Sequence, residues 1–115
     1  MRRFAVTPHS HFAVIRHVGR RSGKPYETPI IAVPWEEGFC IALTYGPEVD
    51  WYRNVLAAGG CGLFWHGREY ALDKPEPLDR GTALLAFPQP LRGILRMRGT
   101  QDFVSLKVQS SEQVN

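Results

Sequence analysis

The sequence has few of the features that mark secreted, membrane-spanning or metal-binding proteins. Its 115 residues include two cysteines and no Cys-x-x-Cys pair, which argues against a disulfide framework and a structural zinc site. No apolar run approaches the roughly 20 residues of a membrane-spanning helix. Residues 1–8 lack the apolar stretch of a signal peptide, so we expect a cytoplasmic protein with Cys40 and Cys61 as buried free thiols. His9 and His11 have no carboxylate or cysteine near them in the sequence, so we expect no metal.

The excess of positive charge is small. The formal net charge is +3, which suits an anionic ligand but is too small and too dispersed to indicate nucleic-acid binding by itself. The aromatic residues fall mostly in expected core strands and are not interleaved with the basic ones, so we expect no nucleic-acid partner. The alternative is a single basic face for nucleic acid, built from Arg16, Arg20, Arg21, Arg92, Arg96 and Arg98.

The most informative stretch is a basic loop, Gly19-Arg20-Arg21-Ser22-Gly23-Lys24-Pro25. Glycine adopts left-handed backbone angles without steric cost, so such a loop can aim several backbone N–H groups at one anion. The two arginines and the lysine add positive charge, and the serine adds a hydroxyl donor. This set favours binding of a phosphate or a carboxylate. The alternative is a basic hairpin turn on the surface.

Hydrophobic patterning predicts strands and helices in the order of an antiparallel barrel. We expect strands at residues 12–18, 27–33, 39–44, 61–65, 68–72 and 103–108, and helices at 50–58, 79–87 and 91–97. Asp50 is the expected N-cap of the first helix, and Gly59 and Gly60 end it. Pro29 must lie at an edge or a bulge, because proline cannot donate to a strand ladder. We expect one domain over residues 1–115, with an irregular lead (1–10), a frayed polar tail (109–115) and a closed or half-closed barrel.

Two motifs together indicate a family. The basic loop, Thr28-Pro29-Ile30 and the helix Asp50-Trp51-Tyr52-Arg53-Asn54-Val55-Leu56-Ala57-Ala58 with its two glycines resemble the deazaflavin-dependent nitroreductases. The pairing of a G-R-x-S-G loop with a W-Y-x-N-L/V-x-A helix is fairly specific, and the resemblance runs from about Ala13 to about Val108. That family belongs with the flavin-binding split barrels. The resemblance implies a mainly β (α+β) split β-barrel, antiparallel, with one central helix and short C-terminal helices.

The resemblance also implies a cofactor and a reaction. The cofactor is coenzyme F420, a deazaflavin with a phosphodiester and an oligoglutamate tail; its reduced form delivers a hydride to a quinone, an enone or a nitro compound. The implied cofactor-binding residues are Arg20, Arg21, Ser22, Lys24, Tyr26, Thr28, Pro29 and Ile30 for the phosphate and tail, and Ala42, Leu43, Thr44, Trp51, Tyr52 and Asn54 near the ring.

The resemblance also bears on the catalytic residue, the acceptor and the oligomeric state. Tyr45 is the candidate catalytic residue, positioned to polarise the acceptor. The acceptor itself is not carried over from the family, because the connection from Tyr45 to Trp51 is shorter than in the nitroreductase. Split barrels of the flavin type usually dimerise, so a homodimer is expected. The alternative is a barrel that binds FMN, a tetrapyrrole or a lipid without F420 turnover.

Overall fold

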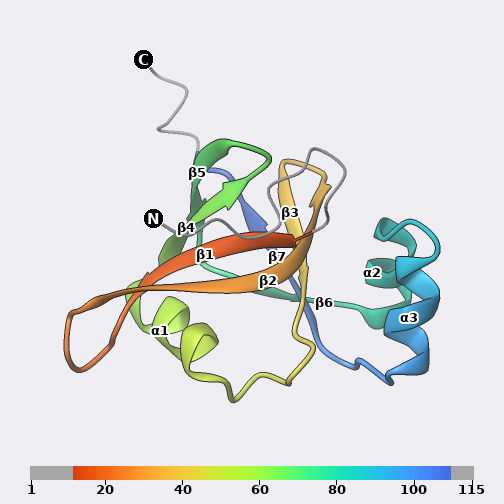
Figure 1. Ribbon diagram of the computed structural model, residues 1–115, viewed down its shortest axis with the longest axis horizontal. Helices are drawn as coiled ribbons and strands as arrows, with labels where there is room; N and C mark the ends of the chain where they lie inside the picture. The colour runs from red at the N-terminus through yellow and green to blue at the C-terminus, as the bar shows by residue number, and fades with distance from the viewer. Residues whose placement is uncertain (1–11, 110–115) are drawn as a thin grey trace.

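Alternating apolar residues build one antiparallel sheet that curls into a half-barrel (Figure 1). The structure is a computed structural model and describes residues 12–109; the expected irregular lead, His9, His11 and most of the expected tail lie outside these residues. The strands are β1 (Phe12–Val18), β2 (Pro25–Trp35), β3 (Gly38–Ala42), β4 (Gly60–Trp65), β5 (Arg68–Asp73), β6 (Glu76–Leu78) and β7 (Phe103–Lys107). The helices are α1 (Asp50–Ala58), α2 (Arg80–Ala86) and α3 (Leu91–Met97).

The strand order brings the two ends of the sheet toward each other. The order is β5-β4-β1-β2-β3-β7-β6, with antiparallel pairing between neighbours. A bridge between Leu72 and Val108, and a bond of 2.9 Å from the Gln109 amide to the Ala71 carbonyl, join β5 to the end of β7. The expectation of a split, antiparallel α+β barrel with a central helix and short C-terminal helices is therefore confirmed.

Both faces of the central strands are buried, which explains their nearly continuous apolar sequences. On β3, Phe39 and Ile41 belong to the core inside the barrel, where they join Val55 of α1. The alternate residues Cys40 and Ala42 belong to a second core against the side chains of α2 and α3. The wall formed by β2, β3 and β7 therefore separates two cores.

Strand β2 is paired in two separate halves. Residues from Pro25 to Ile31 pair with β1, and residues from Ile31 to Trp35 pair with β3, so Ile31 alone belongs to both registers. Pro29 therefore lies where β2 has a partner on one side only. The prediction that this proline lies at a strand edge is confirmed, although β2 is central in the sheet order.

Two strand predictions were wrong in detail. We expected no strand between residues 72 and 103, but β6 lies there and pairs with β7 through Pro77 and Val104. Prolines are tolerated in β6 because it is the last strand of the sheet. Strand β3 ends at Ala42, earlier than expected, because the chain then enters a turn in which the Gly46 amide donates to the Leu43 carbonyl (2.9 Å).

Helix α1 has the expected bounds but not the expected N-cap. The cap residue is Val49, which makes no side-chain capping bond, and Asp50 is the first helical residue. The Asp50 carboxylate instead accepts from Arg20, which removes it from the capping role. Gly59 ends the helix in the left-handed conformation, as predicted.

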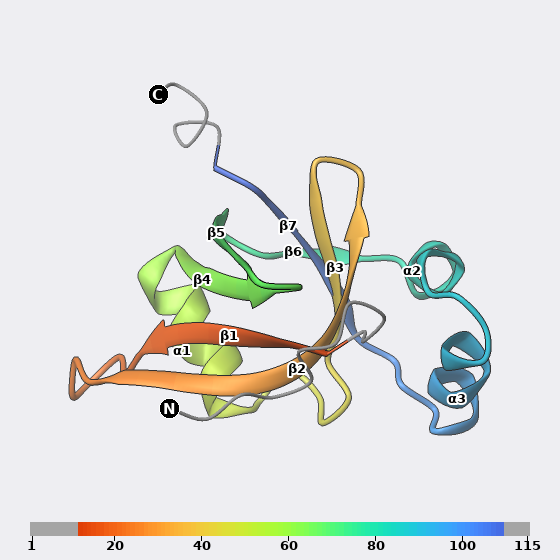
Figure 2. The same cartoon turned by 45° about the horizontal axis from the view of Figure 1, so that its top comes forward.

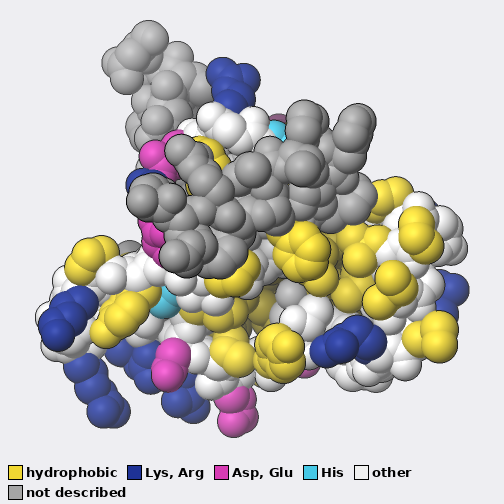
Figure 3. All heavy atoms as spheres, viewed as in Figure 1, with side chains coloured by type: hydrophobic (Ala, Val, Ile, Leu, Met, Phe, Trp, Pro, Cys, Tyr) yellow, Lys and Arg dark blue, Asp and Glu magenta, His cyan; other side chains and the backbone are white. Residues whose placement is uncertain are grey.

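The basic loop and the C-terminal helices lie at opposite ends of the molecule (Figures 1 and 2). The Arg92 guanidinium is turned inward, since its Nε donates to the carbonyls of Leu84 and Phe87 at 3.0 and 2.9 Å. Figure 3 accordingly shows basic side chains gathered at the loop end and others apart from them at the far end. This separation argues against the single basic face considered above.

None of the helices in the described region is long and apolar enough to span a membrane. Over the same residues, no cluster of three or more His, Cys, Asp and Glu side chains could hold a metal ion.

Candidate functional site

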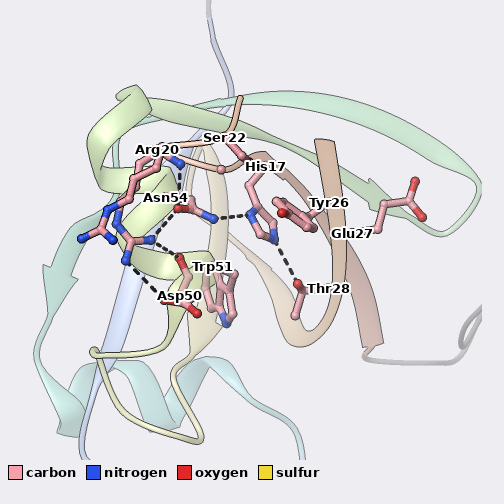
Figure 4. A pocket seen from close by; sticks show the side chains of 11 residues that line it. His17, Arg20, Ser22, Tyr26, Glu27, Thr28, Asp50, Trp51 and Asn54 are labelled. Atoms are coloured by element: carbon pink, nitrogen blue, oxygen red, sulfur yellow. Dashed lines mark hydrogen bonds and ion pairs between the residues drawn. The ribbon is translucent and has the colours of Figure 1, made fainter. Parts of the chain in front are cut away.

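A pocket of about 610 Å³ opens between the basic loop and α1 (Figure 4). The loop supplies one wall, the first two turns of α1 supply another, and the adjoining parts of β1 and β2 complete it. Its volume falls in the range of small-molecule sites. The lining residues are His17, Gly19, Arg20, Arg21, Ser22, Tyr26, Glu27, Thr28, Asp50, Trp51 and Asn54.

The buried amide of Asn54 fastens the basic loop to α1. Its Oδ1 accepts from the Arg20 backbone amide at 3.1 Å and from Arg20 Nη1 at 2.6 Å. Arg20 Nη2 also reaches Asp50 Oδ1 at 3.3 Å. On the other side, Asn54 Nδ2 lies 3.1 Å from His17 Nδ1, and His17 Nε2 lies 3.0 Å from Thr28 Oγ1. These five residues form a continuous chain of polar contacts, called here the Asn54 network.

This network fixes the protonation state of His17. Because Asn54 Oδ1 receives two donors from Arg20, its Nδ2 group must face His17 and donate. His17 Nδ1 is then an acceptor, and the proton of the neutral ring lies on Nε2, where it donates to Thr28. Burial lowers the pKa of His17 below its usual value of 6.5, which agrees with a neutral ring.

The loop has its own internal bonds. The Gly19 amide donates to the Lys24 carbonyl, and the Gly23 amide donates to the Gly19 carbonyl, both at 2.9 Å. Gly23 has φ 72°, which a residue with a side chain adopts only with strain. Ser22 Oγ accepts from the Lys24 amide at 3.1 Å, so its hydroxyl hydrogen remains to donate elsewhere.

Aromatic rings form the apolar walls of the pocket. The Tyr26 ring stacks on His17 with centroids 5.7 Å apart and an angle of 25° between the planes. Trp51 lies across the pocket on α1 and meets Tyr52 edge-on at 5.7 Å. The Tyr52 ring itself is buried in the barrel core, and this burial, with the charge of Asp102 adding to it, raises the pKa of its hydroxyl.

The structure brings together about half of the site residues that the sequence proposed. Arg20, Arg21, Ser22, Tyr26, Thr28, Trp51 and Asn54 all line the pocket. Ile30, Ala42, Leu43 and Tyr52 are buried in the cores, and Lys24, Pro29, Thr44 and Tyr45 do not line it. Tyr45 is 81% exposed, with the Arg98 guanidinium 6.0 Å from the centre of its ring. Its catalytic role stays a prediction, as does the cofactor role of the others.

Sequence reasoning missed two important members of the site, His17 and Asp50. A signal for His17 was present, because period-two alternation places it on the same face of β1 as Ala13 and Ile15, directly before the basic loop. A polar residue at the end of an apolar face, next to a charged loop, indicates a site wall. Asp50 was considered only as a helix cap.

The two cysteines are not nucleophiles. Both are free thiols, as expected from the sequence, with Cys40 buried and Cys61 half-buried. Burial raises the pKa of each thiol to about 12, so both stay protonated near neutral pH.

The lowered pKa of His17 makes stability depend on pH. In the unfolded chain the ring takes up a proton near pH 6.5, whereas in the folded protein it stays neutral to lower pH. The unfolded state therefore binds more protons in this window, and stability falls as the pH drops from about 6.5 through the folded pKa. Urea midpoints of the wild type and His17→Gln, measured at about pH 7.5 and about pH 5.5, test this. We expect the stability of the variant to decrease less than that of the wild type between these two pH values. Equal decreases would contradict the lowered pKa of His17.

Neither a protein-family pattern nor a curated protein matches this sequence. Fifteen chains of solved structures match the fold. One aligns over 88% of this chain and 75% of its own, with a TM-score of 0.62 and 11% identity. Another, described as a domain-swapped dimer, aligns over 86% of this chain and 80% of its own, with a TM-score of 0.57 and 17% identity. Likeness at these identities shows a shared fold, and the homodimer expected for this chain stays a prediction.

Proposed function

We propose that this protein is an oxidoreductase that binds coenzyme F420 and transfers a hydride between it and a small organic acceptor, such as a quinone, an enone or a nitro compound. The observation that carries the proposal is the composition of the pocket. Cationic and hydroxyl groups of the basic loop lie at one side, and the rings of Tyr26 and Trp51 form its walls. This pairing suits a ligand with both a negative charge and a flat ring.

The described residues fit such a coenzyme in chemistry. Arg21 and Ser22 would hold the phosphodiester, and Trp51 would wall the ring together with Tyr26, which the family resemblance had assigned to the phosphate and tail. When bound, the coenzyme supplies the hydride, while the protein supplies orientation and electrostatics. Micromolar binding needs about 8 kcal/mol, and two or three charge-assisted hydrogen bonds at roughly 1.5–3 kcal/mol each, with ring burial, reach that value.

The protein groups then have limited tasks. His17 donates its one ring proton to Thr28, so it holds the Tyr26 side of the pocket in place and does not supply a proton. Neither cysteine supplies a thiolate that could react with the organic acceptor in place of the hydride, because both thiols stay protonated. Free thiols also agree with the cytoplasmic location that we propose for this activity.

Removal of both loop arginines tests the cofactor assignment. We expect Arg20→Ala combined with Arg21→Ala to weaken binding of oxidised F420 at least tenfold, or by about 1.4 kcal/mol, because the loop loses its arginine charges and its bonds to α1. Quenching of tryptophan fluorescence during titration with F420 measures the affinity. Unchanged affinity in the folded double variant would remove the loop from the cofactor site.

Two comparisons make the titration specific. Trp51 lines the pocket, whereas Trp35 and Trp65 pack against the cores, so Trp51→Phe should remove most of the quenching without changing the affinity by much. FMN is titrated in parallel. Quenching by FMN and not by F420 would favour the alternative flavin-binding barrel, and a response to neither would overturn the proposal.

A further inference from the structure

The two arginines of the basic loop have different surroundings although they are adjacent in sequence. The Arg20 guanidinium is engaged by α1: Nη1 donates to Asn54 Oδ1 at 2.6 Å and lies 3.5 Å from the Asp50 carbonyl, and Nη2 pairs with the Asp50 carboxylate at 3.3 Å. Its side chain is 28% exposed. The backbone amide of Arg20 is held by the same Asn54 oxygen. Arg20 is therefore bound at both its backbone and its side chain.

Arg21 lines the same pocket but is not engaged in this way. Within residues 12–109, the structure gives its side chain no hydrogen bond and no ion pair. Figure 4 shows the dashed contacts of Arg20 running to Asn54 and Asp50. None of the five donors of the Arg21 guanidinium is taken by another described residue, which leaves them for a ligand.

The charges lead to the same distinction. Asp50 lies within ion-pair distance of Arg20 and offsets its positive charge, so Arg20 adds little net potential to the pocket. To bind an anion in a bidentate manner, through two parallel N–H bonds, the Arg20 guanidinium would have to release Asn54 or Asp50. Arg21 keeps its full charge and needs no such exchange.

We infer that the two arginines divide the work of the loop: Arg20 is a positioning residue that fastens the loop to α1, and Arg21 is the residue that contacts the anionic group of the ligand. The identity of the ligand rests on the proposed function, whereas the fastening role of Arg20 does not. Through Asn54, the same contacts set the tautomer of His17, so Arg20 also influences the wall formed by β1 and β2.

Measurements on the unliganded protein test the positioning role. We expect Arg20→Ala to speed amide hydrogen exchange at the loop residues Gly19 and Gly23 by about tenfold, because the loop loses the side-chain contacts that attach it to α1. The nitrogen chemical shifts of His17 should move from a single tautomer toward a mixture, since the amide of Asn54 is then less firmly oriented. Arg21→Ala should leave both readouts at their wild-type values. Arg53→Ala, an exposed position on α1, is the matched control and should also change neither.

Binding measurements test the contact role with two probes, oxidised F420 and inorganic phosphate. We expect Arg21→Ala to lower the affinity for both at least tenfold and to reduce the sensitivity of binding to salt, because a free charge is lost. Arg20→Ala combined with Asp50→Asn removes the ion pair without changing the net charge, so it should weaken binding through the loosened loop but keep the salt sensitivity. Lysine at position 21, introduced as Arg21→Lys, should restore the salt sensitivity and part of the affinity.

The outcomes separate this inference from the proposed function. Phosphate binding that depends on Arg21, without any binding of F420, would overturn the cofactor and leave the division of roles supported. Loop exchange in Arg20→Ala as slow as in the wild type would overturn the positioning role. Unchanged affinity in Arg21→Ala, with loss in Arg20→Ala at normal loop exchange, would reverse the assignment.

Discussion

Asn54→Leu is expected to destabilise the protein by about 2–4 kcal/mol and to abolish ligand binding at the basic loop. Leucine branches at the same carbon as asparagine but is the larger side chain, so no cavity is left, and the effect comes from the lost polar contacts with some added crowding. The Asn54 side chain belongs to a residue that is 5% exposed, and it makes three hydrogen bonds. Its loss removes the acceptor of two Arg20 donors and the donor to His17 Nδ1. Each partner left unsatisfied costs about 1–3 kcal/mol, toward the lower end where water reaches it.

Urea unfolding and the F420 titration measure the two parts of this prediction. Arg53→Leu is the matched control, because Arg53 is the neighbouring residue on the exposed side of α1 and should stay within about 0.5 kcal/mol of the wild type. If Asn54→Leu were as stable as the control, the network would not hold the loop, and the pocket described above would be a surface depression without a fixed wall.

Gly38→Ala is expected to cost more than about 3 kcal/mol, enough to leave little folded protein. A Cβ atom at Gly38 would lie 1.9 Å from the carbonyl oxygen of Leu106 and 2.7 Å from the Cα of Lys107. These are backbone atoms of β7, which pairs with β3 at this point, so no side-chain rotation relieves the overlap. The strands must separate, and both cores share that wall.

Gly93→Ala provides the comparison for Gly38→Ala. Gly93 lies within α3, where the nearest atom to an added Cβ is the flexible Gln89 Oε1 at 3.3 Å. Alanine favours a helix over glycine by roughly 1 kcal/mol, so this variant should be neutral or slightly stabilised. Thermal unfolding distinguishes the two. A Gly38→Ala protein with wild-type stability would mean that β3 and β7 are not packed as closely as the structure places them.

Local pattern was enough to predict most of the fold. The bounds of β1, α1 and α3 are as expected, because each combines a clear period with glycine or proline at its ends. Strand β6 was missed because two prolines flank or occupy it and its pairing with β7 connects distant parts of the chain. Its existence depends on a free edge in the finished sheet, which no local window reveals.

The candidate site was predictable in part for a similar reason. The basic loop was identified from its composition, and the pocket forms around it. The partners of Arg20 were not identified, since Asp50 and Asn54 lie 30 and 34 residues away from it in the sequence and meet the loop only after the chain has packed. The positions near the end of β3 came from family resemblance alone, and the structure places Ala42 and Leu43 in the cores.

The divided pairing of β2 makes the basic-loop end of the molecule a separable part. Beyond Arg16, β1 has lost its partner β4, and before Ile31, β2 has not yet met β3. Among residues 12–109, the hairpin from His17 to Tyr26 is consequently joined to the barrel through its own two strands and through its contacts with α1. We expect this segment to accept changes of length or charge, in steps of two residues per strand that keep the register of the barrel, at positions other than His17 and Arg20, which Asn54 binds. Such changes would alter the charge of the loop without the loss of stability expected when the Asn54 contacts are removed.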